Sequence, residues 1–373
     1  MRAILVSLHT KEKRPKELKE SIQELEGLVK ALNGKVIGKL VQKKDIPEPS
    51  TFIGKGKAKQ LAQIAEGTKA DTIIIDTELT PVQISNLEKI TNVSILDRTD
   101  LILSIFEKRA KTKQAKLQVE LAVLEHELPR VYNQRGKHLS RIGGGYKTKG
   151  AGEKLGEIKV RRIKERISKI KKELKNIKSQ NYQQRKSRNK DPNTLKVSLV
   201  GYTNAGKSTL LKRLTKRDTY ISDKLFATLD TKTSYIYIPQ INKKVLITDT
   251  VGFVKDLPES LLEAFMTTLE ELYETDLILH TVDVSDENWT DKVEAVENIL
   301  KKLNLDTKPT VLVLNKIDKV IPSKDYIDEE DETLLALGRE TIVISAEKKW
   351  NLDKLRDILE KYAIQKSYYH MEV

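Results

Sequence analysis

The stretch Gly201-Tyr202-Thr203-Asn204-Ala205-Gly206-Lys207-Ser208 decides the fold of the second half of the chain. It matches the phosphate-loop pattern G-x-x-x-x-G-K-[ST] at every fixed position. An apolar, strand-like segment precedes it at 195–200, and residues 209–214 follow with helical spacing. In this context backbone N–H groups cradle phosphate oxygens, Lys207 adds a positive charge and Ser208 can hold Mg²⁺. The stretch therefore predicts a nucleotide-phosphate site in an α/β domain.

Two later motifs are expected on the phosphate side of this site. Phe226-Ala227-Thr228-Leu229-Asp230 lies in a segment without strong periodicity, and Thr228 is the candidate to complete Mg²⁺ coordination and sense the γ-phosphate. Asp249-Thr250-Val251-Gly252 ends an apolar strand, which puts Asp249 beside Mg²⁺ and the Gly252 N–H near the γ-phosphate. Lys207, Thr228 and Gly252 are the expected catalytic residues, and Ser208, Thr228 and Asp249 the expected metal-side residues.

Two further motifs are expected on the base side. Asn315-Lys316-Ile317-Asp318 follows an apolar strand, and the Asp318 carboxylate can accept hydrogen bonds from two N–H groups of guanine. Adenine offers no matching pair, so this motif favours GTP over ATP. Ser345-Ala346 follows another strand and is expected to place a backbone N–H near the base.

The expected nucleotide contacts come from all of these motifs. They are Gly201, Tyr202, Thr203, Asn204, Ala205, Gly206, Lys207, Ser208, Thr209, Phe226, Ala227, Thr228, Leu229, Asp230, Asp249, Thr250, Val251, Gly252, Asn315, Lys316, Asp318, Ser345 and Ala346. The best-known small GTPases place a water-orienting Gln after the glycine that Gly252 matches, and here the residue is Phe253. We hypothesise that hydrolysis is slow until a partner supplies a polar group or orders Thr228.

Residues 1–100 are predicted to form a small parallel α/β domain. Apolar strands at 3–8, 36–41, 72–76 and 93–96 alternate with segments of helical spacing. The turn Gly54-Lys55-Gly56-Lys57 lacks the third glycine of a dinucleotide fingerprint, so a tight turn is favoured over an anion site.

Residues 101–182 are predicted to form a long antiparallel helical hairpin. Its first helix is expected to carry apolar residues from Leu103 to Leu128 and to end at Pro129. The second has a heptad seam made by Val160, Ile163, Ile167, Ile170, Leu174 and Ile177. A glycine-rich loop at 131–152 should join them, and the polar run 183–192 is typical of a linker.

The positive charge of the chain is concentrated in this hairpin. Residues 101–190 hold 26 Lys plus Arg and 8 Glu, a net charge of +18, whereas the whole chain carries +14. The loop at 131–152 has no acidic residue and includes Tyr132, His138 and Tyr146. This pattern suits RNA phosphates and unpaired bases. A merely solvated surface is the alternative, and an anionic membrane is less favoured because the apolar faces are used in the seam.

The composition excludes several classes of protein. The chain has no Cys, which rules out disulfides and thiolate metal sites. Its longest apolar runs are strand-sized, so no membrane span is expected, and Met1 to Leu8 is interrupted by charge too soon for a signal peptide. A cytoplasmic monomer is the expectation.

Motifs outside the phosphate loop carry a resemblance to a known family. They are Leu96-Asp97-Arg98-Thr99, Leu101-Ile102-Leu103-Ser104-Ile105-Phe106, Lys116-Leu117-Gln118-Val119-Glu120-Leu121-Ala122, Leu128-Pro129-Arg130, Gly143-Gly144-Gly145 and Gly150-Ala151-Gly152-Glu153. Together with 226–230 and 249–253, they make the chain similar to the HflX family of ribosome-associated GTPases.

The resemblance implies an N-terminal α/β domain, a helical hairpin and a C-terminal Ras-like P-loop G domain, expected at 193–365 with a tail at 366–373. It also implies binding to the large ribosomal subunit and its RNA, with a role in translation, ribosome splitting, rescue or biogenesis. Some members carry an extra C-terminal domain, whereas only Gln365 to Val373 follow the last expected helix here. The alternatives are a nucleotide-regulated RNA remodeller or chaperone, and a non-enzymatic RNA-binding protein.

Overall fold

A computed structural model of the chain describes residues 1–11, 14–139, 151–188, 194–215, 232–254, 272–327 and 339–369. The chain divides into two compact units, one reaching from Met1 to Ile177 and the other beginning at Lys178. Each unit contains its own sheet, of four strands in the first and six in the second. Among the helices of the described residues, none is long and apolar enough to cross a lipid bilayer.

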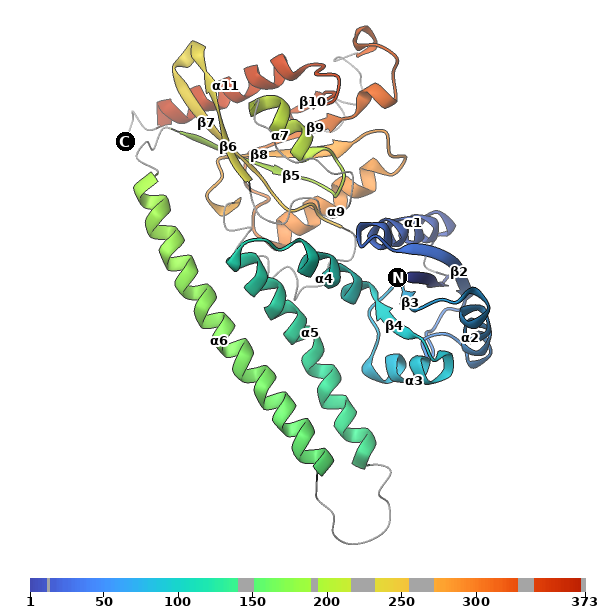
Figure 1. The fold of residues 1–373 in the computed structure, drawn as a ribbon. Coiled ribbons are helices and arrows are strands. Elements are labelled where there is room, and N and C mark those ends of the chain that lie inside the picture. The colour runs from blue at the N-terminus through green and yellow to red at the C-terminus, as the bar shows by residue number, and fades with distance from the viewer. Residues whose placement is uncertain are drawn as a thin grey trace. The chain divides into compact units, whose positions relative to one another are not determined.

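The first unit begins with a parallel sheet covered by helices (Figure 1). Its elements are β1 (Arg2–His9), α1 (Pro15–Ala31), β2 (Lys35–Lys43), α2 (Lys55–Thr68), β3 (Thr72–Ile75), α3 (Pro81–Thr91), β4 (Ser94–Asp97) and α4 (Arg98–Arg109). The strands lie in the order β2-β1-β3-β4 and all pairs are parallel, as predicted. The connection from β1 to β2 runs in one direction across the sheet, and those from β2 to β3 and from β3 to β4 run in the other, so right-handed crossovers put α1 on one face and α2 with α3 on the other.

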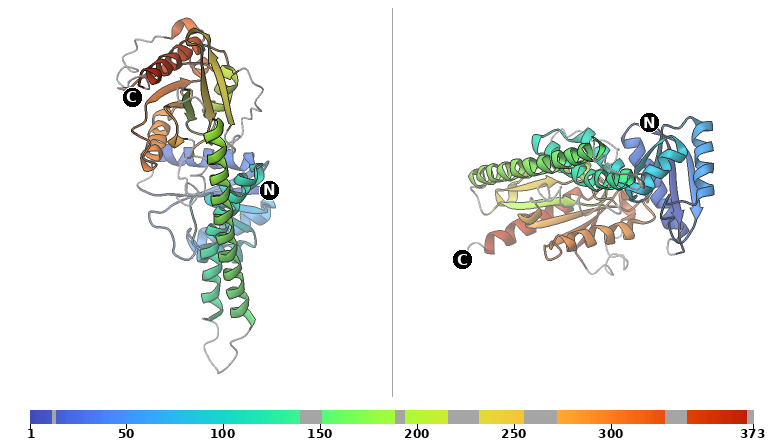
Figure 2. Two further views of the ribbon diagram at one scale, coloured as in Figure 1. Left: turned by 90° about the vertical axis from the view of Figure 1, so that its left-hand side faces the viewer. Right: turned by 90° about the horizontal axis from the view of Figure 1, so that it is seen from below.

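A helical hairpin follows, as predicted, made of α5 (Lys113–Leu139) and α6 (Ala151–Arg188). Figure 2 shows the two helices side by side. Leu117 and Leu121, early in α5, pack on Ile170 and Leu174, late in α6, and Val131 packs on the earlier part of α6. This order makes the pair antiparallel, and all six predicted seam residues of α6 lie in the two clusters.

The prediction of one helix from Leu103 to Leu128 was wrong, because the chain breaks between α4 and α5. Ala110 has an extended backbone (φ −62°, ψ 115°), and the Thr112 hydroxyl accepts a hydrogen bond from Ala115 N at 3.1 Å. Such a side-chain cap begins a new helix. α4 packs against β3, β4 and α1, so the boundary expected at residue 100 falls inside a helix of the sheet layer.

The helix end predicted at Pro129 was also wrong, since α5 continues through Pro129 to Leu139. A proline removes one backbone hydrogen bond, but Val131 beyond it is buried against Val160 and Ile163, and this packing favours continuation. Both ends of the loop expected at 131–152 are therefore helical, and 140–150 lies outside the described residues. The expected linker likewise begins as helix, because α6 extends to Arg188 through Gln, Arg and Lys, which favour helix.

The second unit has a six-stranded sheet with helices on both faces. Its elements are β5 (Leu195–Val200), α7 (Lys207–Thr215), β6 (Lys232–Ile238), η1 (Pro239–Ile241), β7 (Lys243–Asp249), β8 (Leu277–Asp283), α9 (Trp289–Lys302), β9 (Thr310–Asn315), η2 (Ile317–Lys319), η3 (Lys324–Tyr326), β10 (Thr341–Val343) and α11 (Leu352–Tyr369). The order is β10-β9-β8-β5-β7-β6, and only the edge strand β6 is antiparallel to its neighbour among these strands.

Alternating strand residues assign the helices to the two faces of this sheet. Val311 and Val313 of β9 share a core with α7 and α11, whereas Leu312 and Leu314 share one with Val293 of α9. Strand β6 was not predicted, although Tyr235 and Tyr237 alternate with the buried Ile236 and Ile238. The last helix also continues beyond its expected end: within α11, Lys366 donates to Thr194 O at 3.0 Å and pairs with Asp276, which holds the helix beyond residue 365.

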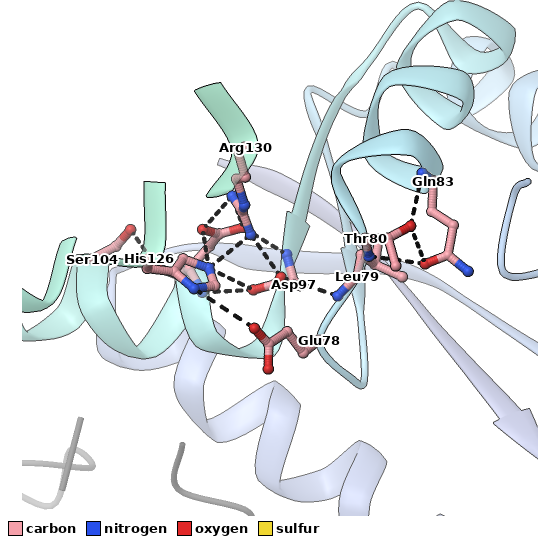
Figure 3. Close-up of polar contacts among 9 residues, drawn as sticks. Glu78, Leu79, Thr80, Gln83, Asp97, Ser104, His126 and Arg130 are labelled. Carbon is pink, nitrogen blue, oxygen red and sulfur yellow. Dashed lines mark hydrogen bonds and ion pairs between the residues drawn. The ribbon is translucent and has the colours of Figure 1, made fainter. Parts of the chain in front are cut away.

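A cluster of charged side chains joins the hairpin to the sheet within the first unit (Figure 3). Asp97 caps α4 by accepting from Asp100 N at 2.8 Å. Arg130 of α5 donates to Asp97 Oδ2 at 2.7 Å and to both oxygens of Asp100 at 2.8 and 3.0 Å. One helical turn earlier, His126 Nε2 lies 3.2 Å from Asp100 Oδ1. Because the Asp97 side chain is fully buried, these cations stabilise a carboxylate that would be costly alone.

The His126 imidazole is held in its charged form by this cluster. Burial would lower its pKa, but hydrogen bonds to Asp100 and Asp97 outweigh burial and raise the pKa to about 9. Arg130 Nη2 also lies 2.7 Å from His126 Nε2, and both side chains contact the Asp97 and Asp100 carboxylates, whose negative charge offsets the repulsion between the two cations. Asp97, Asp100 and His126 offer ligand atoms within 4.8 Å of one another, as a metal site would, but Arg130 already balances the carboxylates.

We expect the attachment of α5 to the sheet layer to weaken as pH rises from 6.5 to about 9. A group whose pKa is higher in the folded than in the unfolded state stabilises the folded state. This stabilisation is complete below the pKa of the unfolded state and is lost as pH rises through the pKa of the folded state. Hydrogen exchange of α4 and α5 amides, corrected for the intrinsic pH effect, should report a loss of about 2–3 kcal/mol of local opening free energy. His126→Gln, which cannot titrate, is the matched control. An equal pH slope in both proteins would contradict the prediction.

Candidate nucleotide-binding site

The glycines of the phosphate loop are required by its backbone and its neighbours. The loop 201–206 joins β5 to α7 at the carboxyl end of the sheet. Gly201 has φ +149°, and a Cβ there would lie 2.1 Å from Thr281 O. Gly206 has φ +96°, and a Cβ there would lie 2.3 Å from Asn315 Nδ2. No other residue type fits either position without moving a neighbouring strand or loop.

Lys207, the first residue of α7, is folded back over the loop. Its Nζ donates to Gly201 O and Tyr202 O, both at 2.9 Å, and the residue is 7% exposed. Burial lowers its pKa to about 8, while the nearby Asp249 carboxylate favours the charged form. A phosphate group bound beside the loop would favour the charged form further, so the position suits an anion.

Ser208 and Asp249 form the expected metal side of the site. Asp249 ends β7 and is fully buried, and its Oδ2 accepts a hydrogen bond from Ser208 Oγ at 2.6 Å. The next residue, Thr250, donates from Oγ1 to Leu199 O at 2.7 Å and fixes the strand end. Hydroxyl and carboxylate oxygens are the ligands that Mg²⁺ prefers, so the two side chains fit this ion. The third expected partner, Thr228, lies with all of 226–230 outside the described residues.

The Gly252 segment lies directly against the phosphate loop. A Cβ on Gly252 would be 2.9 Å from Thr203 Cα and 3.1 Å from Lys207 Nζ. Thr203 N donates to Phe253 O at 2.7 Å, and Phe253 N donates to Gly201 O at 3.1 Å. These two bonds form a short parallel bridge, which holds Gly252 against the loop. The Phe253 ring is buried in the core with Val200.

The Asn315 and Lys316 side chains connect the base-side motif to the phosphate loop. Asn315 Nδ2 donates to Ala205 O at 2.8 Å, and Asn315 Oδ1 accepts from Ala346 N at 3.0 Å. Lys316 Nζ donates to Asn204 O at 2.6 Å. Three loops that are far apart in sequence are therefore joined at one edge of the sheet.

The Asp318 carboxylate is oriented by the last motif. Ser345 Oγ donates to Asp318 Oδ1 at 2.5 Å, and Lys348 N donates to the same Ser345 oxygen at 2.9 Å. The backbone amides of this motif bond within the protein, Ser345 N to Trp350 O at 3.3 Å and Ala346 N to Asn315. In this structure the Ser345 amide bonds within its own loop and the Ala346 amide joins two loops, and their expected contact with a base stays a prediction.

Sequence reasoning missed Asp283, which ends β8 between the two motifs. Its Oδ2 accepts a hydrogen bond from Lys316 Nζ at 2.7 Å. The signal was present, because Asp283 follows the apolar run 277–282 just as Asp249 follows its own strand. A polar residue at the carboxyl end of a parallel strand lies where open α/β sheets bind ligands.

We expect Gly206→Ala to abolish guanine-nucleotide binding, because its Cβ would displace the Asn315 amide. The positive φ adds strain, and together the two effects should destabilise the second unit by about 2 kcal/mol or more. Thermal unfolding with and without GDP would measure both changes. Gly67→Ala in α2 is the matched control: a Cβ there meets nothing within 4 Å, so GDP should stabilise this variant as it does the original chain. Normal GDP stabilisation of Gly206→Ala would contradict the expectation.

Family models match most of the chain. One described as the N-terminal region of a GTP-binding GTPase matches residues 19–107, and its middle region matches 109–188. A third, described as a 50S ribosome-binding GTPase, matches 196–316. A solved structure of a GTP-binding protein from Sulfolobus solfataricus in complex with GDP is 26% identical, with a TM-score of 0.50, covering 98% of this chain and 99% of that one.

Curated relatives named GTPase HflX are similar to this chain over most of its length. One from Caldanaerobacter subterraneus subsp. tengcongensis is 42% identical over 96% of this chain and 80% of its own length. One from Escherichia coli is 40% identical over 84% of this chain and 73% of its own length. With these identities and with the three regions matched in order, the chain belongs to the HflX family of GTPases.

Proposed function

We propose that this protein is a cytoplasmic GTP-dependent switch that acts on the large ribosomal subunit. GTP binding and hydrolysis are the activity of its family, and the model matching 196–316 is described as a 50S ribosome-binding GTPase. The observation that carries the proposal is the joining of the Asn315–Asp318 motif to the phosphate loop through Asn315 and Lys316. In this arrangement one ligand can contact both motifs, with phosphates at Lys207 and a base at Asp318.

In the proposed site the Asp318 carboxylate selects guanine. Ser345 holds one of its oxygens, which leaves the carboxylate directed as an acceptor for N–H groups of the base. A base without a matching pair of donors would leave the half-buried Asp318 carboxylate with its hydrogen bond from Ser345 and no donor from the ligand, and this penalty disfavours adenine.

Hydrolysis in this proposal depends mainly on electrostatic stabilisation of the phosphates. Ser208 and Asp249 would hold Mg²⁺, which when bound neutralises charge on the phosphate oxygens. Lys207 provides a second positive charge, and backbone N–H groups of the loop donate hydrogen bonds to the phosphate oxygens on which negative charge develops during in-line attack by water. The bridge at Phe253 holds Gly252 against the loop, which supports the proposal that the Gly252 N–H responds to the γ-phosphate.

The buried Phe253 ring is the reason to expect slow hydrolysis by the isolated chain. The ring is 4% exposed and belongs to the core with Val200 and Ile278, so this position offers no side-chain group to the attacking water. A partner that supplies a polar group, or orders the segment around Thr228, would accelerate the reaction.

The hairpin provides the surface for ribosomal RNA in this proposal. On α6, exposed cations lie away from the seam at Arg162, Lys169, Lys172 and Lys175. Ion pairs to α5, such as Arg166 with Glu120 at 2.6 Å, use side chains beside the seam. A stripe of exposed lysines on a rigid helix suits the regularly spaced phosphates of folded RNA.

We expect Lys207→Ala to lose GTP turnover by at least about 100-fold, because electrostatic groups at reacting phosphates are worth several kcal/mol. Single-turnover hydrolysis with radiolabelled GTP would measure the loss. Lys212→Ala, one turn along α7, is the matched control and should keep normal turnover. Unchanged turnover in Lys207→Ala would remove the phosphate loop from the proposed reaction.

Purified large subunits should stimulate GTP turnover through the α6 lysines. Replacing Lys169, Lys172 and Lys175 together by Glu should reduce stimulation about tenfold or more and flatten its salt dependence. A variant with Lys301, Lys302 and Lys319 replaced by Glu makes the same charge change on the second unit and should keep its stimulation. An equal loss of stimulation in both variants would show that the effect depends only on net charge. Equal stimulation by protein-free RNA would instead favour an RNA remodeller.

A further inference from the structure

We propose that Asp283 is a positioning residue that holds the Lys316 ammonium on the phosphate loop and thereby sets how long a guanine nucleotide stays bound. The inference rests on the proposed function of the same site and adds a residue outside its sequence motifs.

The sheet register brings Asp283 to Lys316. Asp283 ends β8 and pairs with Asn315 at the end of β9, and Val284 N donates to Asn315 O at 3.0 Å. The residue after Asn315 therefore leaves its strand beside Asp283. Lys316 Nζ is then within 2.7 Å of Asp283 Oδ2 and 2.6 Å of Asn204 O. The ammonium is shared between the β8 end and the phosphate loop.

The Asp283 carboxylate is itself fixed. Its Oδ1 accepts from Ser285 N at 3.1 Å and from Ser285 Oγ at 2.5 Å, which leaves Oδ2 directed at Lys316. Burial would raise the pKa of Asp283, but hydrogen bonds from Lys316 and Ser285 outweigh burial and hold it below its usual value. The carboxylate is consequently ionised at neutral pH and forms a true ion pair with the ammonium.

Lys316 needs such a partner more than an ordinary surface lysine does. Its backbone is left-handed, with φ 67°, and its side chain is only 17% exposed. A lysine side chain has many rotamers, and ordering it costs free energy that a single carbonyl acceptor does little to offset. Asp283, 20% exposed, adds a charge-assisted hydrogen bond in the same partly buried place.

The fixed lysine also shapes the loop beneath it. Its Cε would lie 3.9 Å from a Cβ built on Gly206, so the alkyl stem passes close over the loop. The Lys207 ammonium binds the same loop, at Gly201 O and Tyr202 O. Two ammonium groups on one short loop repel each other, and Asp283 offsets the charge of the second. Without Asp283 we expect the Lys316–Asn204 bond to open and the base-side loop to separate from the phosphate loop.

Asp283→Asn tests the ion pair while keeping the rest of the strand end. The amide oxygen can still accept from Ser285, whereas its NH₂ cannot accept from Lys316. GDP release, followed with a fluorescent GDP analogue, should become about tenfold faster, since the variant replaces a charge-assisted hydrogen bond that holds Lys316 on the phosphate loop. Single-turnover hydrolysis at saturating GTP should change less than about twofold, because the phosphate-side groups are untouched.

A double-mutant cycle separates positioning from a purely structural role. In a Lys316→Met background, Asp283→Asn should change GDP release by less than about twofold, because the partner is already gone. Asp276→Asn is the matched control: this residue lies just before β8, at the opposite edge of the sheet, and pairs with Lys366. It should leave GDP release unchanged.

The outcomes distinguish this inference from the proposed function. If the full effect of Asp283→Asn persisted in the Lys316→Met background, Asp283 would act only through its own loop and the inference would be overturned. Unchanged GDP release in Asp283→Asn, with faster release in Lys316→Met and Asp318→Ala, would also overturn it while the guanine site stood. If neither Lys316→Met nor Asp318→Ala altered GDP release, the proposed function itself would fail.

Discussion

The side-chain amide of Asn315 is the interaction on which the nucleotide site depends. It donates to the phosphate loop at Ala205 O and accepts from Ala346 N, so one buried side chain joins loops that follow β5, β9 and β10. Strands β5 and β9 are not neighbours in the sheet, because β8 lies between them. The sheet brings the loops to one edge, but only a cross-link of this kind fixes their separation. Gly206 is part of the same constraint, because only glycine leaves room for the amide.

Buried carboxylates at strand ends recur in both units, with different consequences. In the first unit, Asp76 accepts from Ser7 and Ser21 and pairs with Arg98, while Asp97 pairs with Arg130. These arginines come from the helices that pack on the sheet, so the charge is balanced by the fold itself. In the second unit, Asp249 faces the Ser208 hydroxyl at the phosphate loop. A carboxylate at the end of a parallel strand thus stabilises the fold in the first unit, whereas in the second unit its position suits ligand binding.

Local sequence could predict the motifs and their strand ends but not the contacts between distant elements. Sequence spacing could predict the parallel sheet, the hairpin seam and the phosphate loop, because each depends on the pattern of residues within short segments. The helix end at Pro129 was mispredicted because Val131 gains burial against Val160 and Ile163, which are about thirty residues away. The Asn315–Ala346 bond and the Asp283–Lys316 pair were likewise invisible, since both depend on strand order and register. Asp283 alone carried a local signal, an acidic residue directly after an apolar strand.

Phe253 limits how the segment after Asp249 can respond to a nucleotide. Its backbone is bridged to Gly201 and Thr203, and its ring is packed in the core with Val200. Withdrawing a buried phenyl ring costs about 2–3 kcal/mol, in addition to the two hydrogen bonds. A change at Gly252 that kept this anchor would have to rotate the chain about Phe253 rather than displace it. The phenylalanine at this position, where the best-known small GTPases have a glutamine, therefore has a structural consequence: it supplies a fixed pivot beside the phosphate loop.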